Sequence, residues 1–209
     1  MKYKKIIILL AIISHVYLIY YFNRDTRITY LALGDSLSVG IDSNGNTNYG
    51  YSNYLANYLK EKDNLKYYSN AFASTTARID DLLYSLEINQ TLELDNKKIS
   101  LKKCLREADL ITLSTGMNNL LADLTLSTTS VDNLSNDEIA VISNNITKDL
   151  EQLFKELRKY CKNKIIFINY YNPYTTSSPS LDRLFSYLNT KTEQLTAKYN
   201  IDYVDIYTP

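Results

Sequence analysis

A serine that directly follows an apolar segment is the first residue of this chain that could do chemistry. The segment that begins at Leu31 reads Leu-Ala-Leu-Gly-Asp-Ser-Leu-Ser-Val-Gly and contains Ser36. A serine hydroxyl attacks an ester carbonyl when a base takes its proton and hydrogen-bond donors stabilise the oxyanion. The only histidine of the chain, His15, lies in the apolar N-terminal segment. The sequence therefore offers a candidate nucleophile without the usual base.

Two later turns could hold donors for the oxyanion. The segment Gly116-Met117-Asn118-Asn119 follows an apolar run over residues 109–114, and the polar segment 70–78 follows another over residues 65–69. In an open parallel sheet, reactive groups gather at the carboxyl ends of the strands. We therefore expect both turns to meet Ser36 at one edge of the sheet.

The elements that must position these turns alternate between strand and helix patterns. Such alternation predicts parallel strands with crossover helices on both faces. The hydrophobic periodicity predicts strands over residues 28–33, 65–69, 109–114, 164–170 and 203–206, and helices over residues 51–62, 79–88, 101–107, 137–161 and 181–199. The sequence thus predicts one α/β domain over residues 28–209.

Composition removes several classes of function. The chain of 209 residues carries 23 basic and 23 acidic residues, so no bulk charge favours a nucleic acid partner. Cys104 and Cys161 could pair in an oxidising compartment, but each precedes a strand-like run, which favours two small buried hydrophobic residues. Neither cysteine has metal-ligand spacing, and we expect no metal.

The N-terminal 27 residues predict a membrane anchor. Lys2, Lys4 and Lys5 precede an uncharged run over residues 6–22, whose 17 residues would span about 25 Å as a helix. Leading lysines predict a cytoplasmic tip, a single-pass helix in the cell membrane and an extracytoplasmic domain. A cleaved signal peptide is the alternative, although small residues are missing where cleavage would occur. Within this run we expect His15 to be tolerated or to pack against a helix.

Taken together, the block Gly34-Asp-Ser36-Leu and the block Gly116-x-Asn118-Asn119 resemble those of the SGNH or GDSL hydrolases, and most of all the bacterial lysophospholipase-type esterases. The resemblance runs from about Thr29 to the last residue. It implies a three-layer α/β/α sandwich of the flavodoxin-like kind, with five parallel strands in the order 2-1-3-4-5. It also implies ester hydrolysis without a cofactor.

The resemblance assigns roles to individual residues. Ser36 matches the nucleophile, and the oxyanion hole would consist of the Ser36 N–H, the Thr76 N–H and the Asn118 side-chain amide. Thr76 stands where the family has a glycine. The register of this block leaves Ser74 and Thr75 as alternatives.

Supporting positions follow from the same blocks. Asp35, Gly116 and Asn119 would hold the site in shape, and Asp35 reads more naturally as a turn or cap residue than as a catalytic one. Asn119 replaces the usual aspartate, whose role in the family is mainly local positioning. Tyr49 and Tyr51, in the loop after the nucleophile, could line a substrate groove or belong to a plain surface loop.

The final block of the family is missing from this sequence. In the family, an Asp and a His three residues apart follow the fifth strand, whereas this sequence ends at Pro209. We therefore expect a serine esterase of the cell surface, acting on lysophospholipids, short acyl esters or acetylated glycans, that is nearly inactive in this form. The alternative is a non-catalytic binding module for an ester- or acetyl-bearing ligand.

Overall fold

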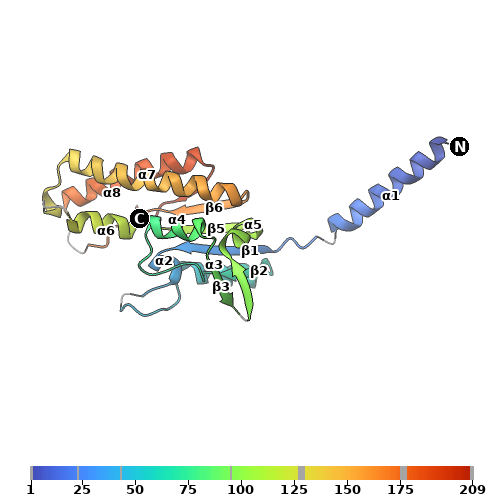
Figure 1. The fold of residues 1–209 in the computed structure, drawn as a ribbon, viewed down its shortest axis with the longest axis horizontal. Coiled ribbons are helices and arrows are strands. Elements are labelled where there is room, and N and C mark those ends of the chain that lie inside the picture. The colour runs from blue at the N-terminus through green and yellow to red at the C-terminus, as the bar shows by residue number, and fades with distance from the viewer. Residues whose placement is uncertain are drawn as a thin grey trace.

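The computed structural model describes residues 2–22, 24–42, 44–94, 96–126, 130–174 and 178–207. An N-terminal helix, α1 (Lys2–Phe22), is followed by an extended segment and then by one α/β domain (Figure 1).

The centre of the domain is a parallel sheet of five strands in the order β2-β1-β5-β6-β7. Each neighbouring pair in this sheet is parallel. The strands are β1 (Ile28–Gly34), β2 (Leu65–Ser69), β5 (Leu110–Ser114), β6 (Lys164–Ile168) and β7 (Asp202–Val204). The apolar runs of β1, β5 and β6 are almost wholly buried, as expected for strands that helices cover on both faces.

When all strands are numbered along the chain, the order of the large sheet differs from the expected 2-1-3-4-5. The difference arises because the chain contains a hairpin that the sequence pattern did not predict. Strands β3 (Thr91–Leu94) and β4 (Lys97–Ser100) pair antiparallel as a separate sheet of two strands. The hairpin lies between the second and third strands of the large sheet along the chain, so later strand numbers rise by two.

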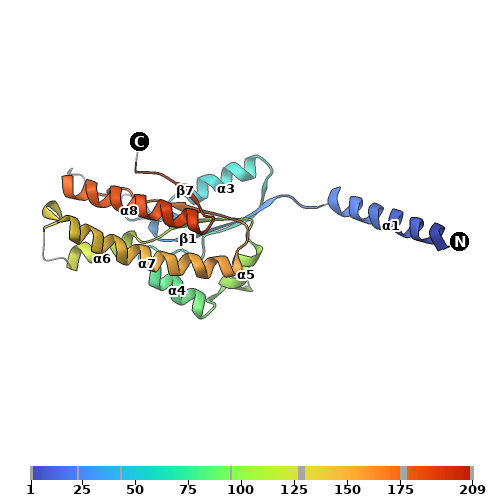
Figure 2. The ribbon, with the colours of Figure 1, turned by 90° about the horizontal axis from the view of Figure 1, so that it is seen from above.

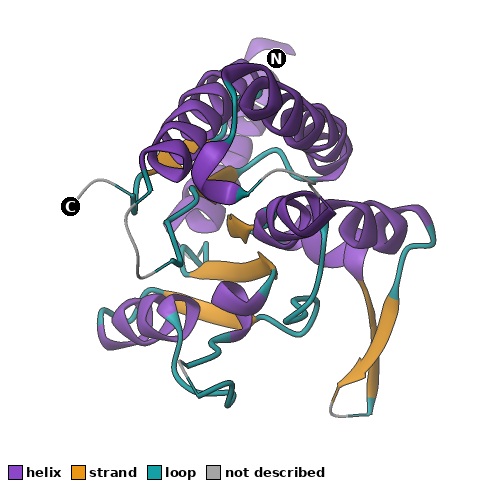
Figure 3. Cartoon of the chain, turned by 90° about the vertical axis from the view of Figure 1, so that its left-hand side faces the viewer, coloured by secondary structure: helices purple, strands orange, loops and turns teal. Residues whose placement is uncertain are grey.

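Helices cover both faces of the large sheet (Figure 3). Helix α3 (Tyr51–Glu61) packs on one face, where Tyr30 and Ala32 of β1 contact Ala56 and Leu59. The other face carries the larger core, which is built with α4 (Ile79–Glu87), α5 (Leu101–Glu107), α7 (Asn136–Tyr160) and α8 (Pro179–Lys198). The short helices α2 (Ser36–Val39) and α6 (Met117–Leu126) and the 3₁₀ turn η1 (Val131–Asn133) follow strand ends or loops.

Helix α1 stands apart from the domain in both ribbon views (Figure 2). Its described apolar side chains, such as Leu10 and Phe22, are exposed. Among the described residues, no helix has the length and apolarity needed to cross a membrane. The transmembrane helix predicted over residues 6–22 is therefore not found in the part of the chain that the structure describes.

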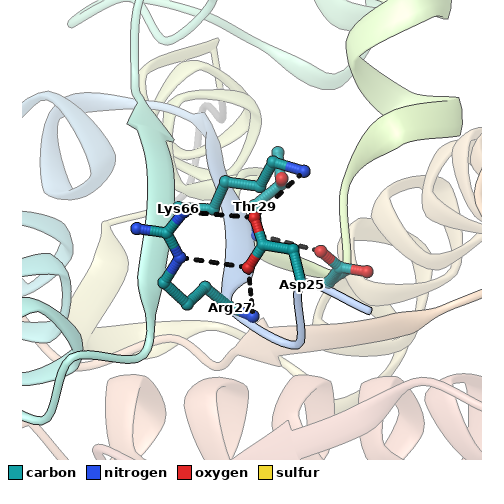
Figure 4. A network of polar contacts seen from close by, with 5 residues as sticks. Asp25, Arg27, Thr29 and Lys66 are labelled. Atoms are coloured by element: carbon teal, nitrogen blue, oxygen red, sulfur yellow. Dashed lines mark hydrogen bonds and ion pairs between the residues drawn. The ribbon is translucent and has the colours of Figure 1, made fainter. Parts of the chain in front are cut away.

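The segment that leads into β1 is fixed at the amino edge of the sheet (Figure 4). The carboxylate of Asp25 accepts from the Arg27 Nε at 3.0 Å and lies 3.5 Å from the Lys66 Nζ of β2. The Thr29 N–H donates to Asp109 at 2.9 Å. These exposed ion pairs lie at the opposite edge of the sheet from the strand ends that carry the candidate site.

Both cysteines are free thiols. Cys161, at the end of α7, is buried in the larger core, and Cys104 of α5 is half-buried against the same core. Burial raises the pKa of both thiols. The prediction of two small hydrophobic residues is confirmed for Cys161 and holds in part for Cys104.

Candidate functional site

Ser36 lies at the carboxyl end of the central strand β1. Strand β1 ends at Gly34, Asp35 caps the next helix, and Ser36 is the first residue of α2. Gly40 ends α2 in the left-handed conformation, with φ of 86°. The Ser36 side chain is half-buried, and none of the described residues forms a hydrogen bond with its hydroxyl. A hydroxyl in this position is available to a ligand.

The end of β1 lies directly against the end of β5. The Asp35 N–H donates to the Ser114 carbonyl at 2.8 Å. Gly34 has φ of 119°, and a Cβ added there would lie 1.6 Å from the Ser114 carbonyl oxygen. Only glycine fits this contact, which explains the glycine before the Asp-Ser pair.

The polar turn after β2 reaches the same strand end. The Ser74 N–H donates to the Gly34 carbonyl at 2.9 Å, and the Ala77 N–H donates to the Ser74 carbonyl at 3.0 Å. These bonds occupy the Ser74 and Ala77 N–H groups and leave those of Thr75 and Thr76 without a backbone partner among the described residues. Thr76 is not among the residues with positive φ, so the threonine in the glycine position causes no backbone strain of that kind.

Asn118 joins this turn to the end of β5. Its side-chain Nδ2 donates to the Ala77 carbonyl at 2.9 Å and to the Thr75 carbonyl at 3.3 Å. Both of its amide protons are therefore used to hold the turn. The structure brings Asn118 and Thr76 together, as the sequence predicts, but points the amide at the turn.

Asn119 holds the start of α4. Its Oδ1 accepts from the Ile79 N–H at 3.0 Å. Only an acceptor oxygen is needed there, which an asparagine provides as well as an aspartate does. The replacement of the usual aspartate therefore leaves this positioning contact in place. Arg78, just before α4, is exposed, and its backbone N–H donates to Asp81 Oδ2 at 2.9 Å.

Gly116 is fixed by a tyrosine beneath it. Its φ is 103°, and a Cβ there would lie 2.3 Å from the Tyr170 hydroxyl oxygen. The Tyr170 hydroxyl donates to the Thr115 carbonyl at 3.0 Å. Burial raises the pKa of Tyr170 well above its usual range. The Tyr170 side chain thus packs against the turn that carries Asn118.

Asp35 is buried, and its carboxyl group meets the hydroxyl of Ser114. Its Oδ1 accepts from the Leu37 N–H at 3.2 Å, which makes Asp35 the N-cap of α2, and also accepts from Ser114 Oγ at 2.9 Å. Burial raises the pKa of Asp35 to about 6, although the hydrogen bonds to Ser114 and Leu37 oppose this shift.

The structure adds four residues that the sequence reading missed as parts of the site: Ser38, Ser114, Thr112 and Tyr170. Ser38 Oγ donates to the Leu33 carbonyl at 2.7 Å and lies 2.8 Å from both Ser114 Oγ and the Tyr51 hydroxyl. Tyr51, which the sequence placed in a groove or a surface loop, donates to Thr112 Oγ1 at 3.1 Å inside the domain. Tyr49 is exposed. Only the position of Ser114 at the end of β5 and of Ser38 in the short helix after β1 could have indicated these two serines.

The site as described contains neither an imidazole nor a metal cluster. The single histidine, His15, lies in α1 and is exposed. Among the described residues, no group of three histidine, cysteine or acidic side chains could hold a metal ion. Of the groups predicted for the site, the Ser36 hydroxyl has no hydrogen-bond partner among the described residues, whereas the Asn118 amide is bound to the carbonyls of Thr75 and Ala77.

Known structures share this architecture. A lipase from a goat rumen metagenome is 22% identical, with a TM-score of 0.66, and the match covers 86% of this chain and 81% of that one. An extracellular lipase from Streptomyces rimosus is 16% identical, with a TM-score of 0.59, over 87% and 81% of the two chains. An acetyl-xylooligosaccharide esterase from Geobacillus is 15% identical, with a TM-score of 0.59, over 88% and 79%. These likenesses show the fold.

A family model shows more than the fold. The model of the GDSL-like lipase/acylhydrolase family matches residues 32–209, which include Ser36, Thr76 and Asn118. No curated protein sequence matches the chain. The match covers most of the chain and starts within β1, just before the candidate nucleophile. The chain therefore belongs to the GDSL-like lipase/acylhydrolase family.

Proposed function

We propose that this protein acts on carboxylic esters through Ser36 as nucleophile. The convergence of three strand ends at Ser36 carries this proposal. Gly34 contacts Ser114 and accepts from Ser74, while Asn118 binds the carbonyls of the same turn. An ester carbonyl placed against the Ser36 hydroxyl would therefore face polar groups from β1, from the turn after β2 and from the turn after β5.

Three groups would stabilise the oxyanion that forms when the Ser36 Oγ attacks. These are the Ser36 N–H, the N–H of Thr76 or its neighbour Thr75, and the Asn118 amide. Each such donor contributes about 10²–10³ in rate. Asn118 must release its bond to the Thr75 carbonyl, the longer of its two bonds at 3.3 Å, before it can donate to a substrate.

The base that takes the serine proton is the missing part of this site. A domain over residues 28–209 contains no histidine. Loss of the base alone costs on the order of 10⁶ in kcat in a serine hydrolase. We therefore propose that these 209 residues hydrolyse esters very slowly.

The substrates we propose are lysophospholipids, short acyl esters or acetylated glycans. The similar structures include proteins named as lipases and as an acetyl-xylooligosaccharide esterase, and those names support the acyl and acetyl classes. The basic tip and apolar run at the N-terminus support action outside the cytoplasm. Fractionation of cells that express the tagged full chain tests this location.

A second function is supported by the same missing imidazole. Without a base, the nucleophile edge could hold an ester, acetyl or carboxylate group without breaking a bond. Such a binding module would need the donors of the oxyanion hole but no proton transfer. Titration with sodium acetate and sodium butyrate, followed by thermal unfolding, would detect binding of this kind.

Hydrolysis of p-nitrophenyl acetate and butyrate tests the first function. The full chain is compared with Ser36→Ala and with Ser186→Ala, which alters an exposed serine of α8 as a matched control. We expect slow release of p-nitrophenol that Ser36→Ala abolishes and Ser186→Ala leaves unchanged. Equal rates for all three proteins, together with stabilisation by acetate, would favour the binding module.

A further inference from the structure

A long stretch of the chain around the start of α3 carries no charged side chain. Residues 43–59 contain no lysine, arginine, aspartate or glutamate, although these four types make up 22% of the whole chain. Tyrosine and asparagine are abundant there instead. The outer face of a surface helix normally carries charged residues, so this composition needs an explanation.

The exposed side of this stretch is formed by Tyr49, Tyr54, Asn57 and Tyr58, which we call the tyrosine surface. Tyr54 and Tyr58 lie one helical turn apart on α3. The Tyr49 ring packs edge-on against the Tyr54 ring, with 5.0 Å between the centroids, and the Tyr49 hydroxyl accepts from Asn57 Nδ2. The three tyrosines are 48%, 65% and 57% exposed in chain order. Aromatic rings are therefore open to a ligand here.

The same surface offers hydrogen-bonding groups that the protein does not use. Among the described residues, none forms a hydrogen bond with the Tyr54 hydroxyl, the Tyr58 hydroxyl or Asn57 Oδ1. A hydroxyl both donates and accepts, and an amide oxygen accepts. Each of these groups can exchange its water for a polar, uncharged group of a ligand.

Charged residues flank the stretch without forming a set of one sign. At one end, the Asp42 carboxylate accepts from two backbone N–H groups of its own loop, at 2.9 and 3.0 Å. At the other end, residues 60–62 comprise two lysines and one glutamate, and the Lys62 Nζ lies 5.8 Å from the centroid of the Tyr58 ring. The tyrosine surface therefore has nothing that selects a strongly charged ligand.

The tyrosine surface is fixed to the turn that carries the candidate nucleophile. Ser52 Oγ, at the start of α3, donates to the Ser38 carbonyl at 2.9 Å. The Tyr51 hydroxyl lies 2.8 Å from Ser38 Oγ. Ser38 belongs to α2, the short helix that begins with Ser36. A ligand on the tyrosine surface is therefore held by a helix that packs directly on the nucleophile helix.

We propose that the tyrosine surface binds a neutral sugar chain. The C–H groups of a sugar ring pack against aromatic rings, whose faces are electron-rich, and its hydroxyl groups need uncharged donors and acceptors. Clusters of lysine and arginine, which recognise anionic lipid surfaces, are missing from residues 43–59. The same stretch lacks the arginine, methionine and phenylalanine that are enriched where proteins meet.

The sugar chain would bring its own ester groups to the candidate nucleophile. Among the three proposed substrate classes, this surface favours acetylated neutral glycans, because they alone carry a chain of sugar rings. That preference rests on the proposed function of Ser36. The binding of the sugar chain does not, since it needs no reaction.

Co-sedimentation of the full chain with insoluble cellulose, mannan and arabinoxylan tests the binding. These polysaccharides are neutral, so the contacts should survive about 0.5 M sodium chloride, which screens charges within a few ångströms. We expect at least one of them to bind the chain equally at low and high salt. Binding to none of the three, or binding that high salt abolishes, would overturn the proposal.

The variants Tyr54→Ala and Tyr84→Ala form a matched pair. Tyr84 is 61% exposed on α4, outside the tyrosine surface and beside the acidic residues Asp80 and Glu87. We expect Tyr54→Ala to bind about fivefold more weakly, the contribution of one aromatic contact, and Tyr84→Ala to bind like the unaltered chain. Equal losses in both variants would show adsorption through any exposed tyrosine and would contradict the proposal. Tyr58→Ala replaces Tyr54→Ala if the latter does not fold.

Two further measurements cover other kinds of partner. Micelles of lysophosphatidylcholine are titrated into the same proteins, and sedimentation velocity of the chain alone detects a second copy. We expect Tyr54→Ala to change neither result. A Tyr54-dependent affinity for micelles, or a Tyr54-dependent dimer, without binding to a polysaccharide would assign the surface to that partner and overturn the proposal.

These experiments separate the inference from the proposed function. If polysaccharide binding depends on Tyr54 while ester hydrolysis does not depend on Ser36, the proposed function fails and the inference stands. If Ser36-dependent hydrolysis is found while none of the three polysaccharides binds, the inference fails and the proposed function stands. Ser36→Ala should bind polysaccharide as the unaltered chain does.

Discussion

Asp35 and Ser36 are neighbours in sequence, but they differ in how far their side chains are exposed to solvent. Ser36 must be reachable by a ligand and is half-buried, whereas Asp35 is 3% exposed and turned into the domain. The first turn of α2 separates them, because Asp35 caps the helix and Ser36 begins it. One short turn therefore supplies both a reactive hydroxyl and a buried anchor.

The buried carboxyl group predicts a dependence of stability on pH. The pKa of Asp35 is about 6 in the folded protein and lies near 3.8 when the group is unperturbed. The folded state then binds more protons than the unfolded state between these values, so the free energy of unfolding falls as pH rises through this window. The expected loss is about 3 kcal/mol, and the curve is flat above it.

Urea unfolding at a series of pH values measures this slope. The contribution of Asp35 is the difference between the unaltered chain and Asp35→Asn, which should lack it. Asp25→Asn is the control, since the Arg27 side chain holds the pKa of Asp25 well below its usual range and its effect falls at lower pH. Parallel curves for the unaltered chain and Asp35→Asn would contradict the prediction.

At the scale of elements, the turn between β5 and α6 depends on Tyr170, a side chain from the segment just after β6. Gly116 has positive φ and lies on the Tyr170 hydroxyl, so Gly116→Ala meets both backbone strain and a clash. We expect the substitution to destabilise the protein by about 2–3 kcal/mol. Chemical unfolding of the purified variant measures this loss.

A second substitution separates the two causes. Tyr170→Phe removes the oxygen that a Cβ at position 116 would meet at 2.3 Å, but leaves the positive φ unchanged. We therefore expect Gly116→Ala to cost about 1 kcal/mol less in a Tyr170→Phe background than alone. Strictly additive effects would show that the clash with Tyr170 is not part of the cost.

The large sheet was predictable because its strands are short apolar runs with helical patterns between them. Residues 109–114 and 164–168 contain continuous apolar stretches, which a strand buried on both faces requires. The hairpin β3–β4 was missed because Thr-Leu-Glu-Leu and Lys-Lys-Ile-Ser are short and half-exposed and pair only with each other. Asn96 lies at positive φ between these two strands, a weak signal of the hairpin.

The candidate site was only partly predictable. Ser36 and Asn118 follow strand ends in recognisable motifs, and the structure brings their turns together. The contact between the Ser38 and Ser114 hydroxyl groups was not predictable, because the two residues are 76 positions apart and serine is common in turns. The direction of the Asn118 amide likewise depends on the two carbonyls of the turn it meets.

At the scale of the whole molecule, we predict that the stability of the α/β domain does not depend on α1. The hydrophobic clusters of the domain contain no residue of α1 in the part of the chain that the structure describes. The Asp25, Arg27 and Lys66 contacts hold the connecting segment to the sheet without involving α1. We expect a chain that starts at Arg24 to unfold at the same urea concentration as the full chain.

Circular dichroism in urea measures both proteins, with and without α1. A chain that starts at Ile28 is the informative control, because it also lacks Asp25 and Arg27. Surface ion pairs contribute at most about 1 kcal/mol, so this second chain should be only slightly less stable. A large loss in the chain that starts at Arg24 would show that α1 packs on the domain.

The position of β1 inside the sheet determines how the candidate site would lose ligand binding when the protein is unfolded by heat or denaturant. Residues 30–34 are buried, and β1 is paired with β2 on one side and β5 on the other. Its amide protons should therefore exchange with solvent only when the whole domain unfolds. Ser36 lies just after β1, so its hydroxyl adjoins the part of the domain that we expect to unfold last. Heat or denaturant should then abolish ligand binding abruptly, at the global transition, with no earlier gradual decline.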